Sequence, residues 1–363
     1  MTRRSAALVA GALFLAAFAG SSWQNADAQG TVLRSPFVVA VQSARRTGLT
    51  RAVACKTPTP PVHDVEGVSY YTDAQHSVAD PAKRAQNVAQ LKPIREYLAT
   101  VTRLVDAAVV GDDAAGTCAW TWFHAWAQAN ALDGTVNRQG AYEREWTLGG
   151  LALSFLKLRD SGVADPAGSP AVVASWLAAV ARRVEPAYEG PKANANNHAY
   201  WTGLAVAAAG VAADDRALFD WGVAKYKIGV DQITPDGTLP LEMARGERAL
   251  HYHFYALTPL VMLAELGRAN GVDLYGMDGG ALHRLVRRLI PAVADPQSFA
   301  KPAGAVQDIA AGGRLSVDEI EWIEPYAAHF PSPALDALLA RYRPLTDPRL
   351  GGDVTVLYAQ RAR

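Results

Sequence analysis

The strongest constraint on the fold is a succession of apolar runs with helical spacing, which covers nearly all of the chain after residue 80. In each run apolar residues recur every three or four positions, the pattern of a helix with one buried face. Clusters of Gly, Pro, Asp and Asn separate the runs and are typical of turns. The runs lie near residues 81–110, 116–132, 139–160, 169–186, 196–212, 214–230, 247–270, 278–293, 317–329 and 333–342. The pattern predicts an all-α protein of about ten helices.

Helices joined in succession by short turns pack as antiparallel neighbours, either in a toroid of helix pairs or in an α-solenoid. The sequence has no regular repeat period, which disfavours the solenoid. We therefore predict an (α/α) toroid with a cleft at one end, suited to an extended polymer. Only residues 353–358 indicate a strand. No change of composition marks a second domain, so residues 67–363 are predicted to form one domain.

The N-terminus is typical of an export signal rather than of a membrane anchor. Two arginines precede an apolar run that ends at Gly20, and small residues around Ala28 fit a cleavage site. The run is too short to span a bilayer comfortably. We expect a signal peptide at residues 1–28 and a periplasmic or secreted protein. Residues 29–66 are rich in Pro, Thr and Val without a helical period, which predicts an extended N-terminal arm.

The charge balance excludes some classes of partner. Lys and Arg together number 35, as do Asp and Glu, so there is no basic excess for nucleic acid binding. A polyanion would have to be attracted by a local basic groove. No second apolar stretch is long enough to span a membrane, so no membrane partner is expected, and a monomer is the default.

Export also makes the cysteines interpretable. Cys55 and Cys118 are the only two in the chain. An oxidising compartment favours pairing, so we expect a disulfide between them rather than two buried thiols.

Two short segments concentrate side chains suited to proton transfer. The first is Asn-Asn-His-Ala-Tyr-Trp at residues 196–201, and the second spans residues 245–255. Elimination across C4–C5 of a uronate requires a neutralised carboxylate, a base at C5 and an acid for the departing O4. An amide, an imidazole and an arginine suit the first task, and a tyrosine or histidine suits the others. The expected catalytic set, which needs no metal, is Asn197, His198, Arg245 and Tyr252.

The spacing of Arg245 and Tyr252 fits joint action. On one helix, residues seven apart share a face and lie roughly 10 Å apart along the axis. Gly246 would allow Arg245 to precede the helix and fold back toward Tyr252. A nearby arginine would lower the pKa of the tyrosine and make its phenolate available.

Each candidate also has an ordinary structural explanation. Asn196 or Asn197 can cap a helix, and His198 can be a satisfied core histidine. Arg245 and Tyr252 can be an exposed arginine and a packed aromatic residue.

His251 and His253 occupy alternate positions, which point to different sides of a helix. We therefore expect no zinc site, and no cofactor is implied.

Candidate substrate contacts lie outside the two segments as well. Tyr70 and Tyr71 occupy a loop, and rings in such loops stack on sugars or pack on the rim of the fold. Arg144 and Trp146 could line the groove or form a helix interface. Glu145, between them, has the pattern of an ordinary solvated helix face.

A series of motifs in collinear order resembles one known family, the alginate lyases of polysaccharide lyase family 5. The motifs extend through most of the chain after the leader. They lie at residues 196–201, 216–230, 236–242, 248–253, 270–274, 324–326 and 349–353.

The resemblance implies an incomplete (α/α) toroid and assigns roles to the catalytic set. It implies that Asn197 and Arg245 neutralise the substrate carboxylate, and that His198 assists them or acts as the base. Tyr252 would be the acid. With mannuronate, where the C5 proton and O4 lie on the same side of the ring, Tyr252 could also be the base. With guluronate they lie on opposite sides, which would require His198 as the base.

The resemblance further implies that Tyr70 and Tyr71 belong to a mobile lid near residues 67–82. Relatives from alginate producers carry a lysine where this chain has Tyr70, so the match is closer to degradative members. The Cys55–Cys118 pair matches a disulfide of some relatives. Further expected substrate contacts within the motifs are Asn196, Trp201, His251 and Arg349.

The combined prediction is an exported, endo-acting lyase that cleaves polymannuronate and leaves a 4,5-unsaturated sugar. Three alternatives are a lyase acting on another polyuronate such as polyglucuronate, a non-catalytic polysaccharide-binding protein, and a glycoside hydrolase. A hydrolase needs two facing carboxylates. The acidic residues available for that role are Asp236, Glu242, Glu247, Asp318 and Glu321.

Overall fold

The computed structural model describes residues 32–47, 53–74, 76–190, 193, 195–309 and 314–359. Residues Leu33–Arg363 form one compact unit. The predicted signal peptide at residues 1–28 lies outside the described residues. Within the described ranges, no helix combines the length and the apolar character needed to cross a membrane.

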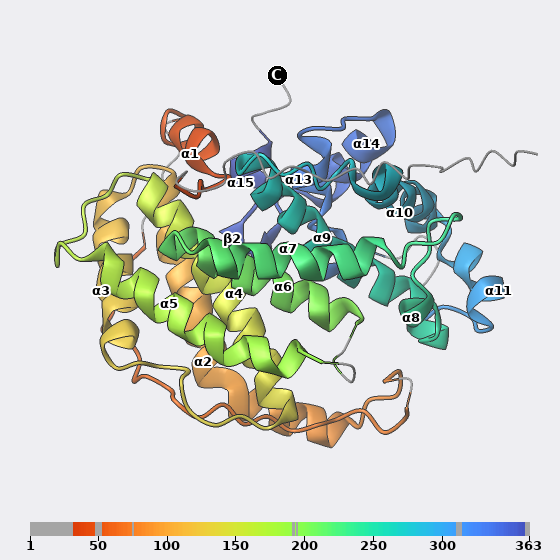
Figure 1. Cartoon of the computed structure of the whole chain (residues 1–363), viewed down its shortest axis with the longest axis horizontal. Coiled ribbons are helices and arrows are strands. Elements are labelled where there is room, and N and C mark those ends of the chain that lie inside the picture. Colours follow the sequence, from red (N-terminus) through yellow and green to blue (C-terminus); the bar gives the residue numbers. More distant parts are fainter. Residues whose placement is uncertain are drawn as a thin grey trace, which may run out of the picture. The chain divides into compact units, whose positions relative to one another are not determined.

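The described chain is largely helical, as its periodicity predicts, and its fold is an (α/α) toroid (Figure 1). The longer helices are α1 (Val38–Arg45), α2 (Pro81–Val109), α3 (Asp113–Gln128), α4 (Arg138–Asp160), α5 (Pro170–Val184), α6 (Asn197–Ala213), α7 (Arg216–Val230), α9 (Ala249–Ala269), α10 (Met277–Ala294) and α14 (Pro333–Tyr342). The short helices are α8 (Pro240–Met243), α11 (Ala300–Ala303), α12 (Val317–Ile320), α13 (Ile323–Ala327) and α15 (Thr355–Tyr358). Short 3₁₀ turns are η1 (Glu185–Tyr188), η2 (Gly246–Arg248), η3 (Pro296–Phe299) and η4 (Pro348–Leu350).

Helix α6 lies at the centre of the packing, and this places the site described below. It is apolar on nearly every side and is surrounded by α4, α5, α7 and α9. Helices α6 and α7 run side by side at very short range (Figure 1). A Cβ on Gly222 would lie 2.4 Å from the Gly203 carbonyl oxygen and 2.5 Å from the Ala207 Cβ. Only glycine permits this approach, because packed interiors have no space for the added methyl.

The structure corrects the predicted secondary structure toward both ends of the chain. Within the arm predicted to be extended, residues 38–45 form α1, whose Val41 and Ala44 are fully buried. The helix is short, so tertiary burial rather than periodicity stabilises it. The single run predicted at residues 317–329 is divided into the short helices α12 and α13.

The strand predicted at residues 353–358 was also wrong for most of its length. Residues 355–358 form α15, and the described strands are the two-residue β1 (Thr346–Asp347) and β2 (Gly352–Asp353), paired antiparallel. Asp353 Oδ1 accepts a hydrogen bond from the backbone N–H of Val356 at 2.9 Å. This bond closes the turn that leads into α15, and such local side-chain bonds outweigh the weak strand preference of β-branched residues.

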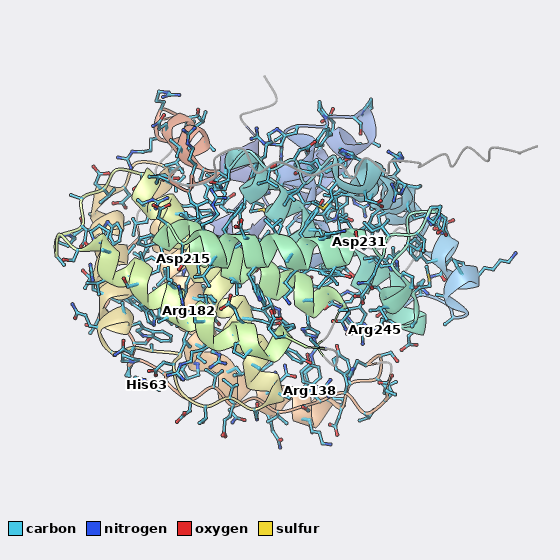
Figure 2. All side chains as sticks on the ribbon, in the orientation of Figure 1. His63, Arg138, Arg182, Asp215, Asp231 and Arg245 are labelled. Carbon is cyan, nitrogen blue, oxygen red and sulfur yellow. A yellow bond between two sulfur atoms is a disulfide. The ribbon has the colours of Figure 1, made fainter. Side chains whose placement is uncertain are left out.

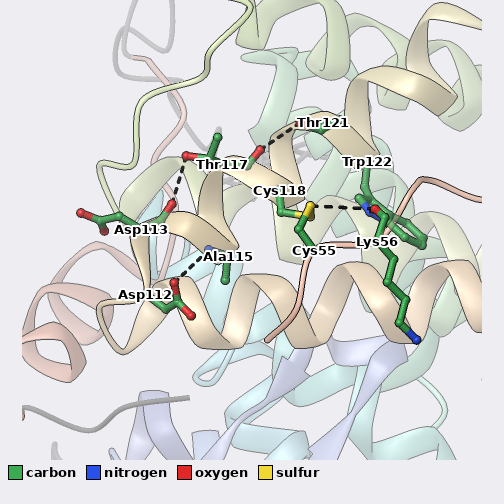
Figure 3. Close-up of a disulfide and its surroundings, with 9 residues drawn as sticks. All are labelled: Cys55, Lys56, Asp112, Asp113, Ala115, Thr117, Cys118, Thr121 and Trp122. Carbon is green, nitrogen blue, oxygen red and sulfur yellow. Dashed lines mark hydrogen bonds between the residues drawn. A yellow bond between two sulfur atoms is a disulfide. The ribbon is translucent and has the colours of Figure 1, made fainter. Parts of the chain in front are cut away.

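The predicted disulfide is confirmed and fastens the arm to the toroid. Cys55 is bonded to Cys118 of α3 (Figure 3). Beside it, the Trp122 indole N–H donates to the Lys56 carbonyl at 2.9 Å. The aromatic side chain of Trp126 donates to the Thr59 carbonyl at 3.0 Å. The arm is therefore held along α3 before it continues toward residue 67.

Loss of this bridge should lower stability without abolishing activity. The bond closes a loop of 63 residues, and cross-links of this kind stabilise by about 2–4 kcal/mol. We expect the Cys55→Ser/Cys118→Ser double variant to lose that much unfolding free energy in urea titrations. Adding a reductant should destabilise the wild type alone. Equal urea midpoints for the two proteins would contradict the prediction.

Candidate active site

A cavity of about 800 Å³ lies at the beginning of α6. It is lined by the loop before α2, the beginnings of α2, α4, α6 and α9, residues 308–309 and 314–319, and one arginine near the C-terminus. The lining residues are Ser69, Tyr70, Tyr71, His76, Arg84, Arg138, Gln139, Tyr142, Trp146, Asn196, Asn197, His198, Arg245, Arg248, His251, Tyr252, Tyr255, Asp308, Ile309, Arg314, Ser316, Asp318, Glu319 and Arg349. Among the described residues that line it, arginines number six and carboxylates three. The excess of positive charge suits an anionic ligand.

The four predicted catalytic side chains all line this cavity. Asn197 and His198 come from the first turn of α6, Tyr252 from the first turn of α9, and Arg245 from the segment just before η2. Figure 2 labels Arg245 and a second lining arginine, Arg138. Residues from distant parts of the chain therefore meet because two helices begin at the same end of the fold.

Asn196 and Asn197 have different tasks at the start of α6. Asn196 is the N-cap, and its Oδ1 accepts the backbone N–H of His198 at 3.2 Å. Asn197 is fully buried, and its Nδ2 lies 3.0 Å from both carboxylate oxygens of Glu242. Its backbone N–H donates to Glu242 Oε1 at 2.8 Å. The first asparagine thus takes the capping role, while the second lines the cavity with its amide nitrogen bonded to Glu242.

His198 is held by a buried carboxylate and stacked on an aromatic ring. Its Nδ1 lies 3.3 Å from Glu145 Oε1, and its ring stacks on Tyr142 with centroids 3.8 Å apart. Glu145 Oε2 accepts hydrogen bonds from the hydroxyls of Tyr188 and Thr202. Because a carboxylate only accepts, Nδ1 carries the hydrogen, and whenever the imidazole is neutral Nε2 presents a lone pair.

This arrangement overturns the sequence interpretation of Glu145. That residue was expected on a solvated helix face, but it is only 1 % exposed. The expectation failed because α4 is enclosed by α2, α5 and α6, so that its charged residues are buried with partners.

Arg245 lies just before the helix and folds back over Tyr252. Its guanidinium carbon is 4.6 Å from the centroid of that ring, and its Nε is 3.6 Å from Glu242 Oε2. Gly246, with φ of 59°, supplies the left-handed backbone that turns the chain into α9. Arg248, which the sequence reasoning missed, lies over the same ring at 5.2 Å. The tyrosine therefore has two cations beside it.

The Tyr252 hydroxyl contacts the loop that crosses the cavity. It lies 3.4 Å from the Tyr71 hydroxyl and 3.3 Å from the carbonyl oxygen of His76. Burial raises the pKa of Tyr252 well above its usual value, Tyr71 adds to this effect, and Arg248 and Arg245 oppose it. The expectation that the arginines leave a lowered pKa is wrong for this arrangement, since desolvation is the larger influence.

The loop over the cavity, described at residues 67–74 and 76–80, is a short hairpin. Tyr71 and Ala79 form an antiparallel bridge, and the turn is closed by Asp73, whose carboxylate accepts the backbone N–H groups of Ser77 and Val78. Arg248 Nη1 donates to the Tyr71 hydroxyl at 2.7 Å. We call residues 67–80 the lid hairpin. In this structure it covers Tyr252.

Six of the eight predicted substrate contacts line the cavity: Tyr70, Tyr71, Trp146, Asn196, His251 and Arg349. Arg349 is held by Asp347 at 2.6 Å, and His251 Nδ1 lies 2.9 Å from Glu319 Oε1. His253 is buried instead, where its Nε2 accepts the Leu239 N–H, so the two histidines face different surroundings.

Two predicted contacts lie elsewhere. Arg144 is buried, and its guanidinium donates to the carbonyls of Gly134 and Arg183. Trp201 is buried beneath Arg349 and donates to the Tyr255 carbonyl at 3.1 Å. Neither side chain lines the cavity, because each points into helix packing that the residue spacing alone does not show.

Comparison with known proteins gives consistent results. The family model described as alginate lyase matches residues 64–299. A polysaccharide lyase of Stenotrophomonas maltophilia is 42% identical over 310 residues, which cover 84% of this chain and 90% of that protein. An alginate lyase of Pseudomonas fluorescens is 35% identical, covering 78% of this chain and 80% of that protein. The crystal structure of alginate lyase A1-III from Sphingomonas species A1 superposes with a TM-score of 0.76 at 28% identity, covering 90% of this chain and 97% of that one. A variant of A1-III with a bound tetrasaccharide gives a TM-score of 0.79 at 27% identity, with the same coverage.

Proposed function

Because this chain belongs to the alginate lyase family, we propose that it is an exported, endo-acting lyase that prefers polymannuronate. It would cleave the chain by β-elimination and leave a 4,5-unsaturated sugar at the new non-reducing end. Its predicted leader lies outside the described residues, and the Cys55–Cys118 bridge supports an oxidising compartment.

The observation that carries the proposal is the position of Tyr252 beside two arginines in a cavity shared with Asn197 and His198. A uronate carboxylate beside Arg245 and Asn197 would lose much of its effective charge. The C5 proton then becomes more acidic, because the carbanion no longer develops beside a full negative charge. Both guanidinium groups lie over the ring of Tyr252, whose hydroxyl can carry a proton.

We propose that Tyr252 protonates the departing O4. For mannuronate, in which both positions lie on one side of the ring, its phenolate would first remove the C5 proton. For guluronate the base must act from the opposite side, and His198 suits this because Glu145 leaves its Nε2 lone pair available. The same cavity thus supports either geometry with different bases.

The lid hairpin would move during each cycle. The Tyr71 hydroxyl and the His76 carbonyl contact the Tyr252 hydroxyl, so a sugar can reach that hydroxyl only when these two groups move away. Movement of the lid hairpin would also remove two causes of the raised pKa of Tyr252, namely burial and Tyr71. The arginines, which favour the phenolate, do not belong to this hairpin.

The direct test is incubation with polymannuronate, polyguluronate and polyglucuronate while absorbance of the unsaturated product is recorded. Product masses would show whether internal bonds are cut. No absorbance increase with any of these polymers would refute the proposal, and binding without turnover would favour a binding protein. Reducing ends without the chromophore would favour a hydrolase, although among its five candidate carboxylates only Asp318 lines the described cavity.

Replacement of His198 should reduce activity with little effect on folding. We expect His198→Ala to lose about 10²-fold in kcat/KM, with a larger loss on polyguluronate than on polymannuronate. Rates on the two polymers and a thermal unfolding curve provide the measurement. The matched control is His63→Ala, because His63 is half exposed on a surface position outside the cavity lining (Figure 2). An equal loss on both polymers would contradict a base role specific to guluronate.

A further inference from the structure

Glu242 is fully buried and is in direct contact with Asn197. Its carboxylate accepts the Asn197 backbone N–H at 2.8 Å and lies 3.0 Å from the amide nitrogen through both oxygens. Within the described part of the chain, Asn197 Oδ1 is buried and accepts no hydrogen bond. The amide therefore gives its donors to Glu242 and is left with an unused acceptor.

This orientation is unsuited to an anionic sugar. A uronate carboxylate accepts hydrogen bonds only, so it needs the amide nitrogen of Asn197 rather than the amide oxygen. Reversing the amide would bring Oδ1 to Glu242, and two acceptors would then face each other. A proton on Glu242 resolves the conflict, because its hydroxyl can donate to Oδ1 while the other oxygen still accepts the backbone N–H.

The surroundings of Glu242 make such protonation accessible. Burial raises the pKa of Glu242, and the hydrogen bonds from Asn197 together with the charges of Arg245 and His198 oppose this. The ionisable groups that face it are Arg245 from its own segment and His198 and Tyr200 from α6. An arriving uronate adds a second carboxylate that competes for Arg245 and Asn197, and like charges in one site favour the neutral form of one.

We propose that Glu242 is a positioning residue that carries a proton while a uronate is bound, and that this proton turns the Asn197 amide nitrogen toward the substrate carboxylate. The proton comes from solvent and stays on the Glu242 carboxyl group, so no bond to carbon is involved. The inference rests on the proposed function, since it assigns the bound uronate to the same cavity.

The first test uses two substitutions at one position. Glutamine imitates the protonated acid, because its amide can donate to Asn197 Oδ1 and accept the backbone N–H. We expect Glu242→Gln to keep kcat/KM within about threefold of the wild type. Glu242→Ala should lose about 10²-fold, the usual effect of one misplaced charge-stabilising donor. The matched control is Glu324→Gln, a buried carboxylate paired with Arg343 away from this cavity.

A Glu242→Gln variant as impaired as Glu242→Ala would overturn the proposal, because it would show that the ionised carboxylate is required. The wild type is assayed in parallel. An active wild type with an inactive Glu242→Gln variant rejects this inference alone, and a wild type that forms no unsaturated product rejects the proposed function and this inference together. If the alanine variant fails to fold, the glutamine variant and the spectrum below still decide.

The second test detects the proton directly. Infrared spectra are recorded for the Tyr252→Phe variant saturated with a mannuronate oligosaccharide, with and without Glu242→Gln. We expect a carbonyl band of a protonated carboxyl group that disappears with Glu242→Gln. A merely structural role for Glu242 would produce no such band. A band missing from the complex, or one that persists in the double variant, would overturn the proposal.

Discussion

Replacing Tyr252 with phenylalanine should lower kcat/KM on polymannuronate by about 10⁴-fold, the upper range for loss of a proton-transfer group. The substitution removes only the hydroxyl, to which we assign transfer of the proton to O4 and, as phenolate, removal of the proton at C5. The ring and the arginines over it remain, so the oligosaccharide Kd should change little. Product absorbance and isothermal titration of an oligosaccharide measure the two quantities.

The pH dependence provides an independent check on the same residue. Burial and Tyr71 raise the pKa of Tyr252, so the hydroxyl is protonated at neutral pH and its phenolate increases as pH rises. Wild-type activity on polymannuronate should therefore increase with pH through the alkaline range, and the residual activity of Tyr252→Phe should not.

A suitable control is Tyr226→Phe. The Tyr226 hydroxyl donates to the Leu274 carbonyl at 2.6 Å outside the cavity lining. Its loss should cost about 1 kcal/mol of stability and leave the rate unchanged. If Tyr252→Phe kept wild-type turnover, the assignment of proton transfer to Tyr252 would be wrong.

Substitution of Arg245 by alanine should reduce kcat/KM by about 10³-fold, the effect expected when the group that balances a developing charge is removed. Arg245 is expected to act on the reaction in two ways. It would neutralise the uronate carboxylate, and its charge over the Tyr252 ring favours the phenolate. Arg245→Lys should recover part of the loss, because it restores the charge without the planar guanidinium.

The control for Arg245→Ala is Arg182→Ala. Arg182 is a half-exposed arginine of α5 paired with Asp215, distant from Arg245 in the view of Figure 2 and outside the cavity lining. Its removal should leave kcat/KM unchanged. Thermal unfolding of both variants separates lost activity from lost folding, since Arg245 lies beside the buried Glu242. Equal activities of Arg245→Ala and Arg182→Ala would refute the role in charge neutralisation.

Much of the fold was predictable because its signals are local. The apolar periods predicted the long helices, and most of their observed ends lie within a few residues of the prediction. The start of α2 has a local cause, because Asp80 precedes Pro81 and its Oδ1 accepts the backbone N–H of Ala82 at 2.9 Å. The failures lie in short segments: α1, α15 and the division between α12 and α13. There, few residues carry a pattern, and packing or a single side-chain hydrogen bond decides the local structure.

The candidate site was predictable only in part. The residue types of Asn197, His198, Arg245 and Tyr252 indicated their chemistry, and all four line one cavity. Arg248 could have been found, since it lies four residues before Tyr252 and so shares its helix face. Glu145 could not, because the sequence contains nothing that distinguishes a buried glutamate from a solvated one on a helix.

The sequence by itself determined the helical class, the disulfide partners and the side chains available for proton transfer, because each of these depends on composition or on spacing within a few turns. Only the tertiary structure decided which groups act on one another. Glu242 contacts Asn197, which lies 45 positions away in the sequence, and the Tyr71 hydroxyl contacts that of Tyr252, which lies 181 positions away. Such contacts arise where the beginnings of separate helices and the lid hairpin meet in the fold, and burial there changes the pKa of a hydroxyl that residue spacing alone would leave unaltered.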